Sequence, residues 1–245
     1  MYSASQLVKY ERCPFAWHQE YIAGHEQQAT AAMVLGSVKH AALLQGPTAV
    51  HEAVEKAMSQ VPSLALKSGD PGKQLRDAID AGYEWQNVTA VKAILRDTQR
   101  EQYITGYISD AEFRGFIDAQ SDDRVYEIKF IGGTGYEYDS ANHQYTHVYY
   151  SRRHYRQATI YQLLAKKPAT IVYLFDSGMV QTIDLSEAME AVAVAEIQAL
   201  IAGIEAGVYS KCGQPSCWAC AADSRDTPFV ITDEPPHRMF EILDA

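Results

Sequence analysis

The segment VYEIKF at residues 125–130 sets a glutamate and a lysine two positions apart in an otherwise apolar, β-branched and aromatic run. Successive side chains of a strand alternate between its two faces, so Glu127 and Lys129 share one face and the apolar residues take the other. A salt bridge on a solvent-exposed face explains this pattern, and so does a catalytic carboxylate beside a catalytic ammonium. The segment therefore predicts a strand and leaves both interpretations of the charged pair open.

The segment FRGFID just upstream alternates in the same way, and a short polar turn joins it to VYEIKF. The two segments are predicted to pair as an antiparallel hairpin with Asp118 opposite Val125. In this register Asp118, Glu127 and Lys129 project from one face, and a diagonal of about 7–8 Å separates the backbones of Asp118 and Glu127. Two carboxylates at that spacing can bind one hard cation. A one-residue slip through a bulge would scatter the three groups.

The order of the predicted elements favours an α/β fold with a mixed sheet covered by helices. Helices are expected first, then a group of strands, and then a helix, a strand hairpin and a long helix that opens at Asp184; these fall near residues 3–100, 103–130, 151–166, 170–184 and 184–207. The chain has 245 residues, of which 47% are hydrophobic, so it can bury a sizeable core.

Composition and charge limit which cellular compartment and which kind of binding partner we expect. The sequence shows no signal-peptide pattern and no apolar run near the ~18 residues of a membrane span, so we expect a cytoplasmic protein. The formal net charge of −10 argues against nucleic acid, yet residues 140–175 contain no Asp or Glu and carry five Lys or Arg, three His and six Tyr. Cations mixed with rings suit a single-stranded nucleic-acid groove, and an amphipathic helix with a basic solvent face explains the segment equally well.

The four cysteines are too few for a disulfide scaffold. Three of them lie within nine residues near the C-terminus; the set is Cys13, Cys212, Cys217 and Cys220. Crowded thiols in a reducing compartment indicate a metal site before a disulfide. Four thiolates suit an iron–sulfur cluster or a zinc ion, and a metal-free arrangement with Cys13 in the core stays open.

These patterns together resemble the PD-(D/E)xK nuclease superfamily. Asp118 followed by Glu127-Ile128-Lys129 is similar to its Asp and acidic-x-Lys motif, although Ile117 stands where the family often has proline. Three further segments resemble the RecB-like branch of this superfamily. The N-terminal helix of that branch, which ends in Cys-Pro, is similar to YSASQLVKYERCPFAW. Its Gly-x-x-x-His helix is similar to LGSVKHAALLQ, and its Gln-x-x-x-Tyr helix is similar to YRQATIYQLLA. The cysteine set resembles the iron–sulfur nucleases of that branch, which include CRISPR-adaptation and recombination exonucleases.

The resemblance implies one nuclease domain over residues 1–245, with a restriction-endonuclease-like mixed sheet flanked by helices. Within it we expect N-terminal helices, a mostly helical insertion, the catalytic sheet, and a C-terminal helix with a cysteine tail that an iron–sulfur site staples to the N-terminus; these parts are residues 1–46, 47–105, 106–184 and 185–245.

The resemblance also implies the site. Asp118, Glu127 and Lys129 are the expected catalytic residues, and His40, Asp118, Glu127 and the Ile128 carbonyl are the expected ligands of Mg²⁺ or Mn²⁺. Lys129 would orient water or offset charge in the transition state. The four cysteines would hold a structural [4Fe–4S] cluster, with zinc as the alternative.

The expected function is a metal-dependent deoxyribonuclease, an exonuclease on single-stranded DNA or DNA ends, that acts in recombination, repair, phage replication or CRISPR adaptation. Its expected partners are DNA and recombination, replication or CRISPR-adaptation proteins, and no membrane is expected. The expected DNA contacts come from one helix and are Arg152, Arg153, Arg156, Gln157 and Tyr161. One alternative is a catalytically silent DNA-binding or assembly subunit with the same fold, and another is a zinc-stabilised protein-interaction module.

Overall fold

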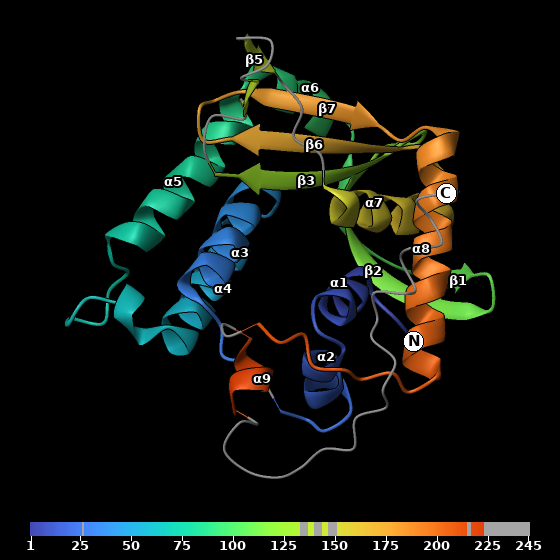
Figure 1. Ribbon diagram of the computed structural model, residues 1–245. Helices are drawn as coiled ribbons and strands as arrows, with labels where there is room; N and C mark the ends of the chain where they lie inside the picture. The colour runs from blue at the N-terminus through green and yellow to red at the C-terminus, as the bar shows by residue number, and fades with distance from the viewer. Residues whose placement is uncertain (26, 133–136, 140–143, 147–150, 215–216, 223–245) are drawn as a thin grey trace.

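The computed structural model describes residues 1–25, 27–132, 137–139, 144–146, 151–214 and 217–222 (Figure 1). Its main feature is a five-stranded sheet in the order β1-β2-β3-β6-β7. β3 and β6 run parallel and the other neighbours are antiparallel, so the predicted mixed sheet is confirmed. The strands are β1 (Gln99–Ile108), β2 (Ala111–Gln120), β3 (Val125–Ile131), β6 (Ala169–Phe175) and β7 (Val180–Asp184). A separate two-stranded ladder joins β4 (Glu137–Asp139) and β5 (Gln144–Thr146).

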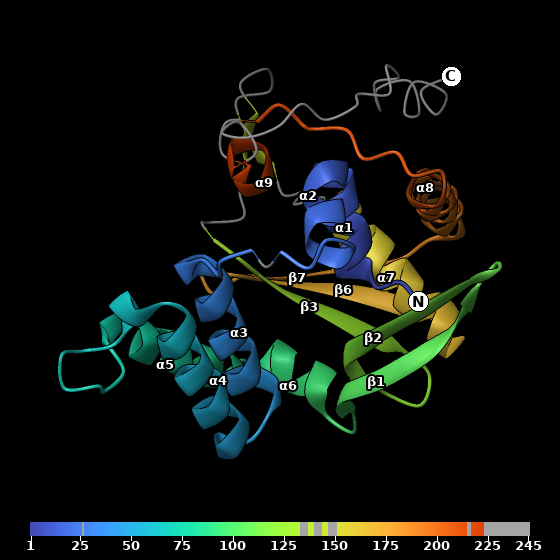
Figure 2. The same ribbon diagram turned by 90° about the horizontal axis from the view of Figure 1, so that it is seen from below.

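Helices cover both faces of the sheet (Figure 1, Figure 2). One face packs against α1 (Ala4–Arg12), α7 (Arg152–Ala165) and α8 (Glu187–Glu205), in a core that includes Phe113, Ile117 and Tyr173. The other packs against α3 (Ala31–Leu44), α5 (Lys73–Asn87) and α6 (Thr89–Leu95), in a core that includes Leu43, Ile128 and Val172. All seven residues of β6 are buried, as its unbroken apolar run requires of a strand covered on both faces.

The helix ends follow local chemistry. Ser3 and Gln6 form a capping box at α1, and Pro14 opens α2 (Pro14–Tyr21), where the Ala16 amide donates to Cys13 Sγ at 3.3 Å. The prediction that Asp184 begins the long helix is wrong. Asp184 ends β7 and accepts a hydrogen bond from Thr170 Oγ1, while Ser186 caps α8 two residues later.

The predicted helical insertion forms a small core of its own. α4 (Pro47–Gln60), a 3₁₀ turn η1 (Pro62–Leu64) and α5 pack around α3 through residues such as Val38, Val54 and Leu75. β1 begins at Gln99, so the last residues of the 47–105 segment belong to the sheet. None of the described helices is both long and apolar enough to cross a membrane.

Gly82 allows α5 to approach α3 closely. A Cβ at this position would lie 2.6 Å from the carbonyl oxygen of Lys39 and 2.5 Å from Cβ of Ala42. Because a backbone carbonyl cannot rotate away, Gly82→Ala should destabilise the protein by about 1–3 kcal/mol. Gly36 is the matched control, since it lies inside α3 with nothing within 4 Å of its Cβ position.

At Gly36 only helix propensity acts, so Gly36→Ala should stabilise the protein by about 0.5–1 kcal/mol. Urea unfolding of both variants checks the pair. Stabilisation by both substitutions would contradict the close α3–α5 contact.

Candidate active site

The candidate active site lies at the point where β2 and β3 stop pairing with each other. Their ladder consists of two pairs, Ala119 with Tyr126 and Gln120 with Val125. The predicted pairing of Asp118 with Val125 is therefore wrong by two residues, because the turn is tight and the Ser121 amide donates to the Arg124 carbonyl. A two-residue shift keeps every side chain on its predicted face.

Beyond this short ladder, other partners take the place of the β2–β3 backbone pairing. Asp118 Oδ2 accepts a hydrogen bond from the Ile128 amide at 2.6 Å, while further along β2 the Arg114 amide donates to the Tyr2 carbonyl. Asp118 is thereby fixed, nearly buried, at the point of divergence.

His40 from α3 connects two carboxylates at this point. Its Nε2 lies 3.3 Å from Asp118 Oδ2, and its Nδ1 lies 3.1 Å from Glu101 Oε1 on β1. His40, Glu101 and Asp118 each offer one ligand atom, and these atoms all lie within 4.8 Å of one another. Two carboxylates and an imidazole form a ligand set that suits Mg²⁺ or Mn²⁺.

Sequence reasoning did not find Glu101. Its neighbours pair with β2 on either side, Arg100 with Ala119 and Gln102 with Ile117, so Glu101 lies across from Asp118. Its φ of 52° is left-handed, which is uncommon for glutamate and marks an irregular point in β1. Pairing the strands of the predicted 103–130 group in register would have been the signal, because the β1–β2 register brings residue 101 to Asp118.

The charges of this group support one another. Burial alone would lower the pKa of His40, but the carboxylates of Asp118 and Glu101 outweigh it and raise the pKa to about 10. Burial tends to raise the pKa of Asp118, and the charges of His40 and Lys129 hold it below its usual value. At neutral pH and without a cation, the imidazolium therefore holds the two carboxylates together.

Glu127 and Lys129 form an ion pair next to Asp118. The side chain of Glu127 is only 1% exposed, so a solvent-facing salt bridge is excluded. Burial and the charge of Asp118 raise the pKa of Glu127 to about 7 against the opposing effect of Lys129. Glu127 Oε2 accepts no hydrogen bond from the described part of the chain.

The predicted metal ligands are therefore brought together in part. His40 and Asp118 share a compact group with Glu101, whereas Glu127 faces Lys129 and is not a member of that group. Ile128 contributes an amide to Asp118. The buried, unbonded Oε2 of Glu127 is an additional oxygen donor beside this group, and the donor set as a whole fits a hard divalent cation.

α7 lies beside the acidic centre. Tyr161 is buried, and its Oη accepts a hydrogen bond from Gln157 Nε2 at 3.4 Å. Burial and the charge of Glu127 raise the pKa of Tyr161, which keeps its hydroxyl protonated next to the carboxylates. The Gln157–Tyr161 pair of the predicted helix thus faces the site.

The arginines of α7 are neutralised by acids from distant helices. Arg156 is 3% exposed and pairs with Glu196 at 2.7 Å and with Glu11. Its burial argues against a contact with a phosphate, and we assign it a structural role. Arg152 and Arg153 also approach these acids, at 3.6 and 3.1 Å, but their side chains are half exposed. Most of the tyrosines and histidines of the 140–150 stretch lie outside the described residues.

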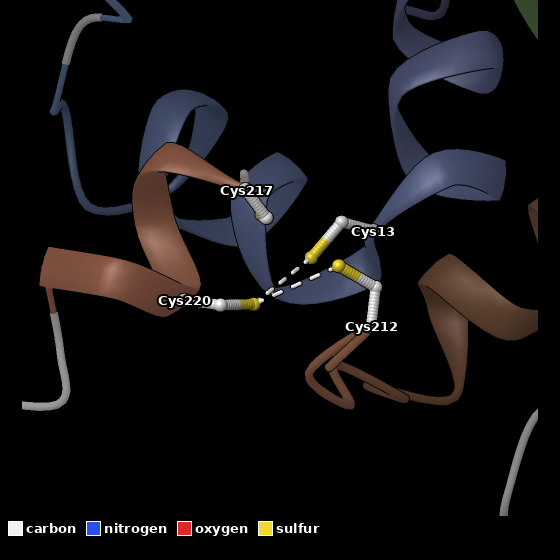
Figure 3. A group of neighbouring side chains, drawn as sticks. All are labelled: Cys13, Cys212, Cys217 and Cys220. Carbon is white, nitrogen blue, oxygen red and sulfur yellow. Dashed lines mark hydrogen bonds between the residues drawn. The ribbon is translucent and has the colours of Figure 1, made fainter. Parts of the chain in front are cut away.

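The four cysteines meet at the junction of α1 and α2, where Cys13 lies (Figure 3). Cys13 Sγ lies 3.6 Å from Cys220 Sγ, Cys212 Sγ lies 3.8 Å from Cys220 Sγ, and all four sulfurs lie within 4.8 Å of one another. Cys220 lies on α9 (Trp218–Ala222), which packs beside α2 (Figure 1, Figure 2). The group therefore connects the N-terminal helices to the C-terminal segment, as predicted for a metal staple.

Comparison with known proteins bears on the family and on the fold. A family model described as the PD-(D/E)XK nuclease superfamily matches residues 1–225. The crystal structure of a "putative exonuclease" from Eubacterium rectale superposes with a TM-score of 0.68 at 14% identity, over 94% of this chain and 90% of that one. The structure of a protein called SSO0001 is 17% identical over 81% and 84% of the two chains, with a TM-score of 0.34. No curated protein matches the sequence.

Proposed function

Because the chain belongs to the PD-(D/E)XK nuclease superfamily, we propose that it is a metal-dependent deoxyribonuclease that acts as an exonuclease on single-stranded DNA or DNA ends. The observation that carries this proposal is the convergence of His40, Glu101 and Asp118 beside the buried Glu127–Lys129 pair. A family member that had lost catalysis would have no need to keep a costly group of buried charges in one place.

In the proposed reaction His40, Glu101 and Asp118 would hold the cation. Glu127, whose carboxylate interacts with the charges of Asp118 and His40, would supply a further oxygen beside it. A divalent cation there would polarise the phosphoryl oxygen and lower the pKa of the attacking water. Glu127, with a pKa of about 7, can take up a proton near neutral pH. Lys129 stays protonated because Glu127 and Asp118 raise its pKa against the effect of burial, and it can offset negative charge on the phosphate.

The substrate side of the proposal uses the exposed part of α7. Arg152 and Arg153 keep half-exposed guanidinium groups that could contact phosphates. Gln157 and Tyr161 are proposed to order the acidic centre rather than to bind DNA directly. Action with recombination, replication or CRISPR-adaptation proteins, and a cytoplasmic location, stay predictions.

Degradation of end-labelled DNA tests the proposal. The wild-type chain should shorten single-stranded DNA with Mn²⁺ or Mg²⁺, stop in EDTA, and lose activity on Lys129→Met. Intact DNA with every metal and either labelled end would favour the alternative of a silent DNA-binding subunit.

The pKa of His40 predicts that cation binding is coupled to proton release. Below about pH 10 the imidazole is protonated in the cation-free protein, and it must lose that proton to become a ligand. The affinity for Mn²⁺ should therefore rise with pH, by about tenfold per unit between pH 7.5 and 9, where Glu127 is already ionised and only the His40 proton is displaced. Calorimetry in buffers of different ionisation enthalpy measures this release.

His40→Gln is the control for the pH dependence. It removes the titrating ligand, so the affinity should be weaker and its pH slope shallower. An affinity of the wild type that does not change with pH would contradict the assignment of His40 as a ligand.

We also propose that the four cysteines hold a structural metal centre. The family resemblance favours a [4Fe–4S] cluster. The sulfur separations of 3.6 and 3.8 Å favour a single ion, because a tetrahedron with Zn–S bonds of about 2.3 Å has edges of about 3.8 Å. A brown preparation with stoichiometric iron identifies the cluster, and a colourless one with one zinc per chain identifies the ion.

A further inference from the structure

The outer face of the β1–β2 hairpin exposes three large aromatic side chains. Tyr103, Tyr107 and Phe116 are 57%, 70% and 55% exposed. Tyr103 and Phe116 are cross-strand partners, and their ring centroids lie 5.2 Å apart. The opposite face of the same hairpin is buried against α7. Aromatic rings gathered on one exposed face are typical of a binding surface.

This ring pair lies directly beside the candidate active site. Tyr103 follows Glu101 by two residues, and Phe116 precedes Asp118 by two residues. Two residues of strand span about 7 Å, so the rings are adjacent to the acidic pair on both strands. Arg114 is exposed and, by the alternation of the strand, follows Phe116 on the same face. A path from the acidic centre along the hairpin thus meets two rings and then a cation.

Rings and a cation in this order match a strand of nucleic acid with unpaired bases. Exposed aromatic rings stack on bases of any sequence, and an arginine nearby pairs with the phosphate backbone. In a duplex the base faces are already stacked on one another, so the rings would find no free partner. Self-association is the competing use of the face, and its expected sign is a dimer that the substitutions dissociate.

We propose that Tyr103 and Phe116 form a stacking platform for the unpaired bases of the DNA strand whose phosphate occupies the active site, with Tyr107 and Arg114 extending it along the hairpin. This inference rests on the proposed nuclease function and names its substrate class as single-stranded DNA. It assigns substrate recognition to β1–β2, in addition to the α7 contacts expected from the sequence.

Fluorescence anisotropy without added divalent cation separates binding from cleavage. At fixed salt, Tyr103→Ala combined with Phe116→Ala should raise the Kd for a labelled oligothymidine about 100-fold, or about tenfold for each ring, and should change the Kd for a blunt duplex less than twofold. Phe116→Tyr should keep wild-type affinity, whereas Phe116→Leu should lose about tenfold, because leucine is apolar but cannot stack. Leu66→Ala, which removes an exposed side chain far along the chain in the α4–α5 connection, is the control and should change neither Kd.

Three results would overturn the platform. These are unchanged oligothymidine binding in the double variant, an equal loss for duplex and single strand, and a dimer in sedimentation that the substitutions dissociate. If the wild type still degrades DNA in any of these cases, the platform fails alone. If the wild type neither binds nor degrades DNA, the proposed function fails with it.

Discussion

Glu127→Gln should reduce DNA cleavage by about 10³-fold and leave the protein folded. Gln has nearly the same shape, so the substitution removes only the negative charge and the ability to take up a proton. In the proposed site that charge lies beside the cation ligands and holds Lys129 in place. Single-turnover cleavage of end-labelled single-stranded DNA at saturating Mn²⁺ measures the loss of the chemical step.

Although Glu127→Gln should lower activity, it should raise the stability of the protein relative to wild type as pH increases. Glu127 has a folded-state pKa of about 7, above its unfolded value, so the folded protein holds the proton more tightly and loses stability as pH rises from about 4.5 to 7. The neutral amide removes this contribution. The melting temperature of the variant relative to wild type should therefore increase between pH 5 and pH 8.

Glu84→Gln provides the control, because it makes the same chemical change at an exposed position of α5. It should alter neither cleavage nor the pH dependence of melting. A Glu127→Gln variant that cleaves normally would show that the charge of Glu127 is not needed for the chemistry. A variant that unfolds at pH 8 would show that the Glu127–Lys129 pair serves the fold.

The sequence predicted the central part of the site because its spacing is local. Asp118, Glu127 and Lys129 lie within 12 residues, and strand alternation keeps them together even though the predicted register was off by two. A shift of one residue would have dispersed them. Glu101 was missed because its position depends on the pairing of β1 with β2 and on a left-handed backbone angle that no propensity predicts.

The charge of the predicted nucleic-acid segment could not be read from its own residues. The stretch from 140 to 175 contains no acid, but α1 and α8 bring Glu11 and Glu196 against its helix, 145 and 40 residues away from Arg156 along the chain. A buried guanidinium needs such partners, so the fold uses Arg156 for packing. Local charge counting cannot detect a neutralising residue that only tertiary contacts supply.

Cys13→Ser should abolish metal binding at the cysteine group and lower the melting temperature by at least about 10 °C, since structural metal sites contribute several kcal/mol to folding. Serine is a good N-cap, so the hydroxyl can still accept the hydrogen bond from the Ala16 amide that Cys13 Sγ accepts now. The variant therefore keeps the cap of α2 and removes only the thiolate. Calorimetry with metal quantification measures both effects.

A chelation cycle isolates the contribution of the metal from that of the side chain. Burial raises the pKa of the Cys13 thiol, so a bound cation is needed to hold it as thiolate between α2 and the C-terminal segment. Removing the metal should lower the melting temperature of the wild type to that of Cys13→Ser and should leave the variant unchanged. Ser210→Ala is the control, because the Phe15 amide donates to the Ser210 carbonyl and this backbone bond does not depend on the side chain. The control should have the melting temperature of wild type before and after chelation. Equal melting temperatures for wild type and Cys13→Ser before chelation would mean that the four sulfurs lie together without binding a metal.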